Sequence, residues 1–280
     1  MNSENPLNQR LSIQAYFINM DRDVARKVHM QEQSERLGVE FKRVPAVEAA
    51  SLDLADVPQL RQGQYGFTRW EISRLSVAVF LSHRRAWQNI LESNADQAIV
   101  MEDDLVFHDG FVRAVNAILA SGIRYDVVRL NTSDQSRLMG APVGLQQGFE
   151  LRRIFNEMAD AGCYLVSRHA CEVLLAQSEE FCDHLDDFVF SPRRKLDVFQ
   201  LTPPVAGQVI HEAGLSEEWL QKGMAVSVRE NGGAATKLAK GPLFYRVVKE
   251  LSRAVRSLKN KYRSLFLGAE TVHLNRLSEK

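Results

Sequence analysis

The chain has 280 residues, of which 45% are hydrophobic and 25% are charged, enough apolar material for one large or two small folded domains. This composition excludes disorder as the main state. The 35 basic residues equal the 35 acidic ones, so the total charge does not indicate a nucleic-acid partner. The charge is unevenly distributed: residues 237–280 contain eleven Lys or Arg and three Asp or Glu, a net +8, which leaves −8 on the rest.

The cysteines and the N-terminus indicate the cellular compartment in which the protein is expected to reside. Cys163, Cys171 and Cys182 are odd in number and lack zinc-binding spacing, which favours a reducing environment. The first apolar stretch, residues 15–20, is too short for a signal peptide or a membrane span. We therefore expect a cytoplasmic protein without a membrane crossing.

The predicted elements alternate between strands and helices. This alternation predicts an α/β fold with a mostly parallel central sheet that is covered by helices. In chain order, the elements are a strand at 11–20, a helix from 24 to its C-cap at Gly38, a strand at 39–47, a helix at 75–93, a strand at 98–107, a helix at 111–122, strands at 125–131 and 162–167, a helix at 169–178 and a strand-like stretch at 196–208.

Two segments lack periodicity. Residues 133–148 follow a strand directly and predict a mobile loop over the site. Residues 223–242 are typical of a flexible linker. We therefore expect a main domain over 1–222, this linker, and a basic helical tail over 243–280.

Three consecutive acids carry the strongest chemical signal. Apolar residues 98–101 lead directly into Glu102, Asp103 and Asp104. Burying an ionised carboxylate costs several kcal/mol unless it is paired or bound to a metal, and oxygen ligands favour Mg²⁺ or Mn²⁺. The acids therefore predict a metal site at the end of a strand, where α/β folds bind ligands. The alternative is a solvated acidic turn.

Four segments in the right order resemble glycosyltransferase family 25, the bacterial lipopolysaccharide-type galactosyltransferase family. The resemblance covers roughly residues 12 to 210, and the combination is more specific than any single motif. The segments are YFINMDRDVAR at 16–26, RVPAVEA at 43–49, FLSHRRAWQNIL at 80–91 leading into AIVMEDDLVF at 98–107, and AGCYLVSRHAC at 161–171 before HLDDFVF at 184–190.

This resemblance implies a sugar-nucleotide-dependent transferase with a Rossmann-like, GT-A type fold. In the family, an acid-x-acid motif holds a divalent metal on the donor diphosphate. By that motif, Glu102 and Asp104 are the implied ligands of Mn²⁺ or Mg²⁺, and Asp103 contacts the donor ribose or the metal. A divalent cation would stabilise the negative charge that grows on the departing diphosphate.

Polar residues after the first strand are candidates for binding the donor. Asn19, Arg22 and Arg26 follow this strand, and the two arginines are four residues apart, so we expect them to share a helical face that reaches the donor. The alternative is that both arginines lie on an ordinary amphipathic helix. The family resemblance favours donor binding.

Ser82 and His83 interrupt an apolar helix and are therefore expected to be buried and hydrogen-bonded. A single histidine on such a face is more often structural than catalytic. Because of its LSH motif, we expect His83 to line the donor pocket or to brace the acids, and we group both residues with the donor site.

An inverting transfer needs a base that accepts the proton of the acceptor hydroxyl. Asp186 and Asp187 in the HLDDF motif are the candidates, because repulsion between adjacent carboxylates raises one pKa. The alternative is a helix N-terminus, where aspartate is also favoured. The two roles are compatible.

The basic tail predicts an amphipathic helix. Basic residues flank a narrow apolar seam, and such a helix can lie on an anionic bilayer or pair with a second helix; the third alternative is a helix docked on the domain. The seam consists of Phe244, Val248, Leu251, Val255, Leu258, Tyr262 and Leu265.

The combined prediction is a bacterial, metal-dependent, inverting glycosyltransferase. It would move a hexose, galactose from UDP-galactose, to a lipid-linked saccharide such as a lipooligosaccharide, in the cytoplasm or on the cytoplasmic face of the inner membrane. Two alternatives are a non-catalytic sugar-nucleotide or glycan-binding protein and a metal-dependent phosphohydrolase. The non-catalytic alternative gains support from residues 75–78, because they replace a Gly-Glu-Ile-Gly-like stretch of the family and lack its acid.

Overall fold

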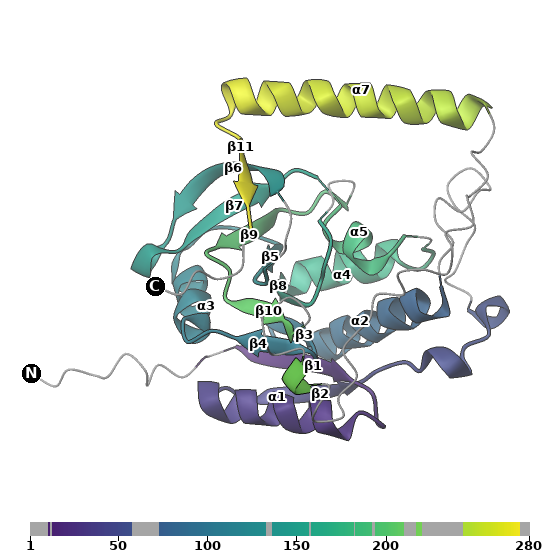
Figure 1. Ribbon diagram of the computed structural model, residues 1–280, viewed down its shortest axis with the longest axis vertical. Coiled ribbons are helices and arrows are strands. Elements are labelled where there is room, and N and C mark those ends of the chain that lie inside the picture. The colour runs from purple at the N-terminus through teal and green to yellow at the C-terminus, as the bar shows by residue number, and fades with distance from the viewer. Residues whose placement is uncertain are drawn as a thin grey trace, which may run out of the picture.

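The computed structural model describes residues 11, 13–57, 73–132, 136–156, 158–181, 183–191, 194–209, 217–219 and 243–274. Within these residues, one large sheet and one small sheet are surrounded by helices (Figure 1). The elements are β1 (Gln14–Asn19), α1 (Val24–Leu37), β2 (Phe41–Pro45), α2 (Arg74–Glu92), β3 (Gln97–Glu102), β4 (Leu105–Phe107), α3 (Phe111–Ala120), β5 (Val127–Arg129), β6 (Ser136–Gly144), β7 (Glu150–Ile154), β8 (Cys163–Ser167), α4 (Arg168–Gln177), α5 (Leu185–Val189), β9 (Val198–Thr202), β10 (Ala206–Gln208), α7 (Leu243–Phe266) and β11 (Glu270–His273).

The large sheet is mixed, with the strand order β11-β6-β7-β9-β5-β8-β3-β1-β2. Strands β2, β1, β3, β5 and β9 run in one direction, and β8 runs the opposite way between β3 and β5. The expected mostly parallel sheet is therefore found in this part. Strands β7, β6 and β11 extend it in antiparallel pairs. The short connection between β6 and β7 permits only an antiparallel pair at that position.

Alternation along β1 shows how the core is divided. Tyr16 and Ile18 pack into a cluster with residues of α2, α4 and α5, whereas Ala15 and Phe17 pack into a second cluster with residues of α1 and α3. Both faces of the sheet are therefore covered, as expected for strands with nearly continuous apolar sequences.

The prediction of a mobile loop over residues 133–148 is wrong for most of this segment. Residues 136–144 form β6, which pairs with β7, and a 3₁₀ turn follows at 146–148; residues 133–135 lie outside the described part. The alternation of apolar and polar residues that would indicate a strand is hidden in the sequence, because the pairing register shifts between Met139 and Pro142. Met139 is fully buried and anchors this strand in the core.

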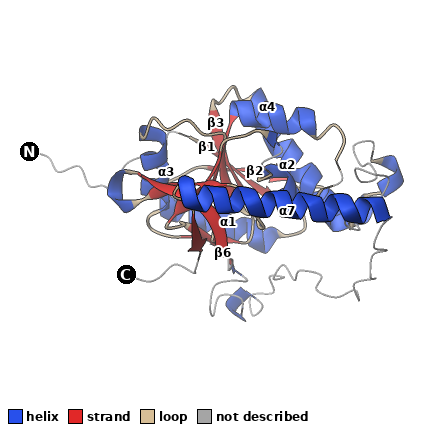
Figure 2. Ribbon diagram, turned by 90° about the horizontal axis from the view of Figure 1, so that it is seen from above, coloured by secondary structure: helices blue, strands red, loops and turns tan. Residues whose placement is uncertain are grey.

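The C-terminal region is not entirely helical. After α7, strand β11 pairs with β6 and forms the edge of the large sheet, and Figure 2 shows α7 crossing the face of the domain in that view. In the described part of the chain, no helix is long and apolar enough to span a membrane. Cys163 and Cys171 are free and buried, whereas Cys182 and the expected linker at 223–242 lie outside the described residues.

Candidate active site

The polar side chains gather where the parallel strands end. Ile18 of β1 is the pairing partner of Glu102 in β3, so Asn19 and the three acids leave the sheet at the same level. Strand β8 is antiparallel to β3, and Cys163 pairs with Met101, so the residues that precede β8 also lie beside the acids. Ligands bind at this edge in open α/β sheets.

The acidic motif is not a solvated turn. Asp103 and Asp104 are only 7% and 3% exposed, and 27% of the Glu102 side chain is exposed. Strand β4 follows the acids immediately and pairs with β10, which fixes the bend between β3 and β4. The enclosed carboxylates therefore depend on positively charged or hydrogen-bonding partners.

Asp103 has such partners within the protein. Its Oδ2 accepts a hydrogen bond from Asn19 Nδ2 at 2.8 Å, and its Oδ1 forms an ion pair with Arg26 Nη1 at 2.8 Å. Burial lowers the pKa of Arg26, but the charges of Asp103 and Asp104 outweigh this effect, and the net pKa is raised. The predicted residues Asn19, Arg26 and Asp103 thus form one network that joins β1, α1 and the end of β3.

Arg22 lies apart from this network. Helix α1 begins at Val24, after its N-cap Asp23, so Arg22 and Arg26 do not share a helical face as expected. The Arg22 side chain is 61% exposed and pairs with Glu48. Exposed ion pairs contribute little to stability, so Arg22 is available to exchange this partner for an anionic ligand.

Glu102 has a polar neighbour at each oxygen. Its Oε2 accepts a hydrogen bond from Gln208 Nε2 at 2.9 Å, and its Oε1 lies 3.7 Å from His83 Nε2. Burial raises the pKa of Glu102 to about 8, and the charges of Asp160 and Asp103 add to this rise. A nearby cation favours the charged form of a carboxyl, so the position suits a metal ion.

Ser82 and His83 are buried in α2. The Ser82 hydroxyl donates to the carbonyl of Ala78 at 2.7 Å and accepts the backbone N–H of Val47 at 2.8 Å. His83 Nδ1 lies 2.9 Å from the hydroxyl of Tyr164, and burial lowers the pKa of His83 to about 3, so the ring is neutral. This placement favours support of the acids over direct contact with a donor.

Asp160 is a site residue that the sequence analysis missed. Its φ is 72°, its Oδ1 accepts the backbone N–H of Gly162 at 2.9 Å, and its Oδ2 lies 3.8 Å from Nη2 of the fully buried Arg129. Glu102 donates its backbone N–H to the carbonyl of Gly162, two residues after Asp160, at 2.8 Å, and the charge of Asp160 contributes to the raised pKa of Glu102. The available signal was Asp-Ala-Gly directly before a strand, because aspartate is favoured in tight turns.

The predicted acid pair lies in the first turn of α5, as the helix N-terminus alternative expected. Asp186 Oδ2 accepts the backbone N–H of Asp160 at 3.1 Å, and Asp186 Oδ1 accepts the backbone N–H of Asp187 at 2.8 Å. The charge of Asp186 also contributes to the raised pKa of Glu102. The HLDDF motif and the acidic motif therefore meet at one site.

These features define an α/β domain whose carboxylates converge on the carboxyl edge of its sheet. The chain belongs to glycosyltransferase family 25, described as "Glycosyltransferase family 25 (LPS biosynthesis protein)", whose profile matches residues 12–189. The matched region contains both acidic motifs, Asp160 and the polar residues after β1.

Similar proteins cover parts of the chain. A "Glycosyltransferase 25 family member" of Anopheles gambiae is 25% identical over 147 residues, 48% of this chain and 25% of that protein. "Procollagen galactosyltransferase 1-B" of Xenopus laevis is 28% identical over 114 residues, 38% of this chain and 18% of that protein. The chain thus spans a quarter or less of these two relatives.

Solved structures are only distantly similar. A "glycosyltransferase involved in the glycosylation of the major capsid of PBCV-1" shares 11% identity over 74% of this chain and 98% of that chain, with a TM-score of 0.36. Similarity at this level supports no conclusion about function.

Proposed function

We propose that this protein is a GT-A type glycosyltransferase that moves galactose from UDP-galactose, with inversion, to a lipooligosaccharide or another surface glycan. Family membership supports the transferase activity, and the name of the Xenopus relative supports galactose. The observation that carries the proposal is the convergence of Glu102, Asp160 and Asp186 at the carboxyl edge of the sheet, where Asp103 and Asp104 directly follow Glu102 in the chain.

A divalent ion, Mn²⁺ or Mg²⁺, fits the acidic motif. Glu102 and Asp104 are the proposed ligands by the family's acid-x-acid motif, and Asn19 and Arg26 hold Asp103 between them. In the described part of the chain, no group of three or more His, Cys, Asp or Glu residues could enclose a metal. In the proposed complex, one or two carboxylates would share the ion with substrate phosphates. Such an ion would neutralise the charge of the departing diphosphate.

The remaining residues divide into donor contacts, supports and a base. We propose that Arg22 exchanges Glu48 for the donor diphosphate and that the network of Asn19, Arg26 and Asp103 shapes the nucleotide site. Asp187 is the proposed base, and Asp186, which accepts the backbone N–H groups of Asp160 and of Asp187, is the proposed support of the turn at Asp160. Ser82 and His83 support the site from α2.

Donor turnover tests the proposal. The protein is incubated with UDP-galactose, UDP-glucose or UDP-N-acetylglucosamine and Mn²⁺, with and without an acceptor glycan, and released UDP is measured. We expect UDP release that depends on Mn²⁺ and increases with acceptor. Binding without release would instead favour the non-catalytic alternative, and release of inorganic phosphate would favour the phosphohydrolase.

Helix α7 offers a surface for the proposed lipid-linked acceptor. Its outward apolar residues follow at intervals of four, three, four and three and are each at least half exposed: Leu251, Val255, Leu258, Tyr262 and Leu265. We call these five residues the apolar stripe. The side chains of Phe244 and Val248, which were expected to extend it, lie outside the described ones.

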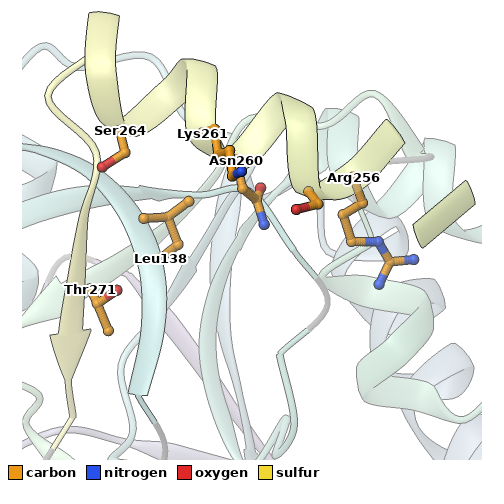
Figure 3. Close-up of a pocket in the computed structure, with 7 residues that line it drawn as sticks. Leu138, Arg256, Asn260, Lys261, Ser264 and Thr271 are labelled. Carbon is orange, nitrogen blue, oxygen red and sulfur yellow. The ribbon is translucent and has the colours of Figure 1, made fainter. Parts of the chain in front are cut away.

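The opposite face of α7 is polar. Figure 3 shows that the groove between the helix and the sheet is lined by Arg256, Asn260, Lys261 and Ser264 of α7, with Leu138 of β6 and Thr271 of β11. A helix that docked by its apolar face would show the reverse arrangement. The apolar stripe therefore points away from the domain.

An anionic membrane is the proposed partner of the apolar stripe. From Leu251 to Leu267 the sequence contains five basic residues and no acid, so a second copy of this helix would bring like charges together. Arg256 and Lys261 of these five line the groove on the domain side, and each basic residue that reaches an anionic lipid surface contributes about 1 kcal/mol. The proposed location is the cytoplasmic face of the inner membrane.

A further inference from the structure

A chain of buried polar side chains leads from the core to the acidic motif. Trp87 Nε1 donates a hydrogen bond to the hydroxyl of Tyr164 at 2.8 Å, and this hydroxyl lies 2.9 Å from His83 Nδ1. His83 Nε2 points to Glu102, whose Oε1 is 3.7 Å away. Trp87, Tyr164 and His83 are each at most 1% exposed, so water does not compete for these contacts.

The hydrogen-bonding chemistry of these groups favours one arrangement of their hydrogens. The indole N–H of Trp87 can only donate, so the Tyr164 oxygen accepts from it and keeps its own hydrogen for His83 Nδ1. Burial raises the pKa of Tyr164 well above its ordinary value and lowers that of His83, so both groups are neutral. The single ring hydrogen of His83 therefore resides on Nε2.

This N–H is a buried donor directed at the acidic motif. His83 Nε2 has no hydrogen-bond partner among the described residues, and leaving a buried donor unsatisfied costs about 1–3 kcal/mol. The 3.7 Å separation from Glu102 Oε1 exceeds a hydrogen bond, but catalytic contacts often tighten when a substrate binds. Gln208 already holds the other oxygen, Oε2.

We propose that Trp87, Tyr164 and His83 are positioning residues that orient Glu102 for metal binding. Trp87 and Tyr164 set the hydrogen on His83, His83 donates to Oε1 of Glu102, and Gln208 donates to Oε2. Each carboxylate oxygen keeps a lone pair for the cation. The inference rests on the proposed metal-dependent function, and partners of this kind change metal affinity by about 10- to 100-fold when mutated.

Two substitutions of His83 separate this role from a purely structural one. In His83→Gln, the side-chain amide nitrogen occupies the place of Nε2 and can still donate to Glu102. In His83→Asn, the shorter amide can accept from Tyr164 but cannot reach Glu102. If His83 has only a structural role, His83→Asn should retain more Mn²⁺ affinity than His83→Gln. If His83 positions Glu102, His83→Gln should retain more.

The experiment is a Mn²⁺ titration in the presence of UDP, with free Mn²⁺ measured by electron paramagnetic resonance. We expect affinity within a few-fold of wild type for His83→Gln and a loss of about 10- to 100-fold for His83→Asn. Tyr164→Phe should also weaken binding, whereas Tyr125→Phe, which removes a hydroxyl bonded to Gln97 at the other end of β3, should not. Melting temperatures are recorded for all four variants.

Three results would overturn the inference. Equal Mn²⁺ affinities of wild type and His83→Asn would refute this inference and leave the metal-dependent function standing. Weaker Mn²⁺ binding by His83→Gln than by His83→Asn would do the same. A wild-type protein that binds no Mn²⁺ in the presence of UDP would refute both this inference and the metal-dependent function on which it rests.

Discussion

Arg26 Nη1 lies 2.8 Å from Asp103 Oδ1, in an ion pair whose side chains are only 12% and 10% exposed. The pair joins the first turn of α1 to the bend after β3. The conformation of the acidic motif therefore depends on a helix that lies about 80 residues earlier in the sequence.

Removal of this arginine should destabilise the fold. Arg26→Ala leaves the Asp103 carboxylate buried without its cation, and breaking a buried pair in this way costs about 3–5 kcal/mol. Arg22→Ala is the matched control, because it removes an exposed pair worth at most about 1 kcal/mol. Urea unfolding measures both, and equal stabilities would contradict the structural role of Arg26. UDP affinity should fall in both variants, because Arg22 is a proposed donor contact and Arg26 belongs to the network proposed to shape the nucleotide site.

The two aspartates of α5 should respond differently to amidation. Asp187→Asn removes the proposed base, so kcat should fall by about 10²- to 10⁴-fold with little change in KM. Asp186→Asn leaves one of two backbone N–H groups without its acceptor, which should lower the free energy of unfolding by about 1–2 kcal/mol. A stable, inactive Asp186→Asn together with an active Asp187→Asn would reverse the assignment.

Asp160 should tolerate asparagine better than alanine. Its φ of 72° costs roughly 1–3 kcal/mol for most residues, but asparagine adopts this conformation readily and keeps an oxygen for the N–H of Gly162. We therefore expect Asp160→Ala to unfold at clearly lower denaturant concentration than Asp160→Asn. Both variants should bind Mn²⁺ and UDP more weakly, because each removes a charge near Glu102. Equal unfolding midpoints would argue against a conformational role.

Vesicle binding tests the apolar stripe. Truncation before α7 is unsuitable, because it would also remove β11 from the sheet. The double variant Leu258→Glu/Leu265→Glu changes two side chains that are 67% and 76% exposed, so it should fold normally yet lose binding to vesicles that contain phosphatidylglycerol. Val143→Glu, at an exposed position of β6, is the control. Binding of the double variant at the wild-type level would exclude this surface.

Much of the fold could be predicted because its signals are local. The apolar strand at β1, the helix ended by Gly38 and the helix that contains Trp87 all correspond to observed elements. The contacts between elements could not be predicted. Nothing in the sequence indicates that β8 enters between β3 and β5, and this placement alone brings Asp160 beside Glu102.

The candidate site shows the same division. Glu102 and Asp104 could be named as candidates because an apolar strand delivers them to its end. Tyr164 and Trp87 resemble ordinary core residues in the sequence, since only the folded chain brings their polar atoms to His83. Arg22 was misplaced on a helical face because helix α1 begins two residues later than that expectation required.

The central claim is that carboxylates at the end of β3 hold a divalent ion on a nucleotide diphosphate. Crystals grown with Mn²⁺ and UDP, measured at the manganese absorption edge, test it most directly. We expect an anomalous peak within bonding distance of Glu102 or Asp104 and of the diphosphate oxygens, and no such peak in the Glu102→Gln/Asp104→Asn double variant. A diphosphate bound without manganese at these carboxylates would contradict it.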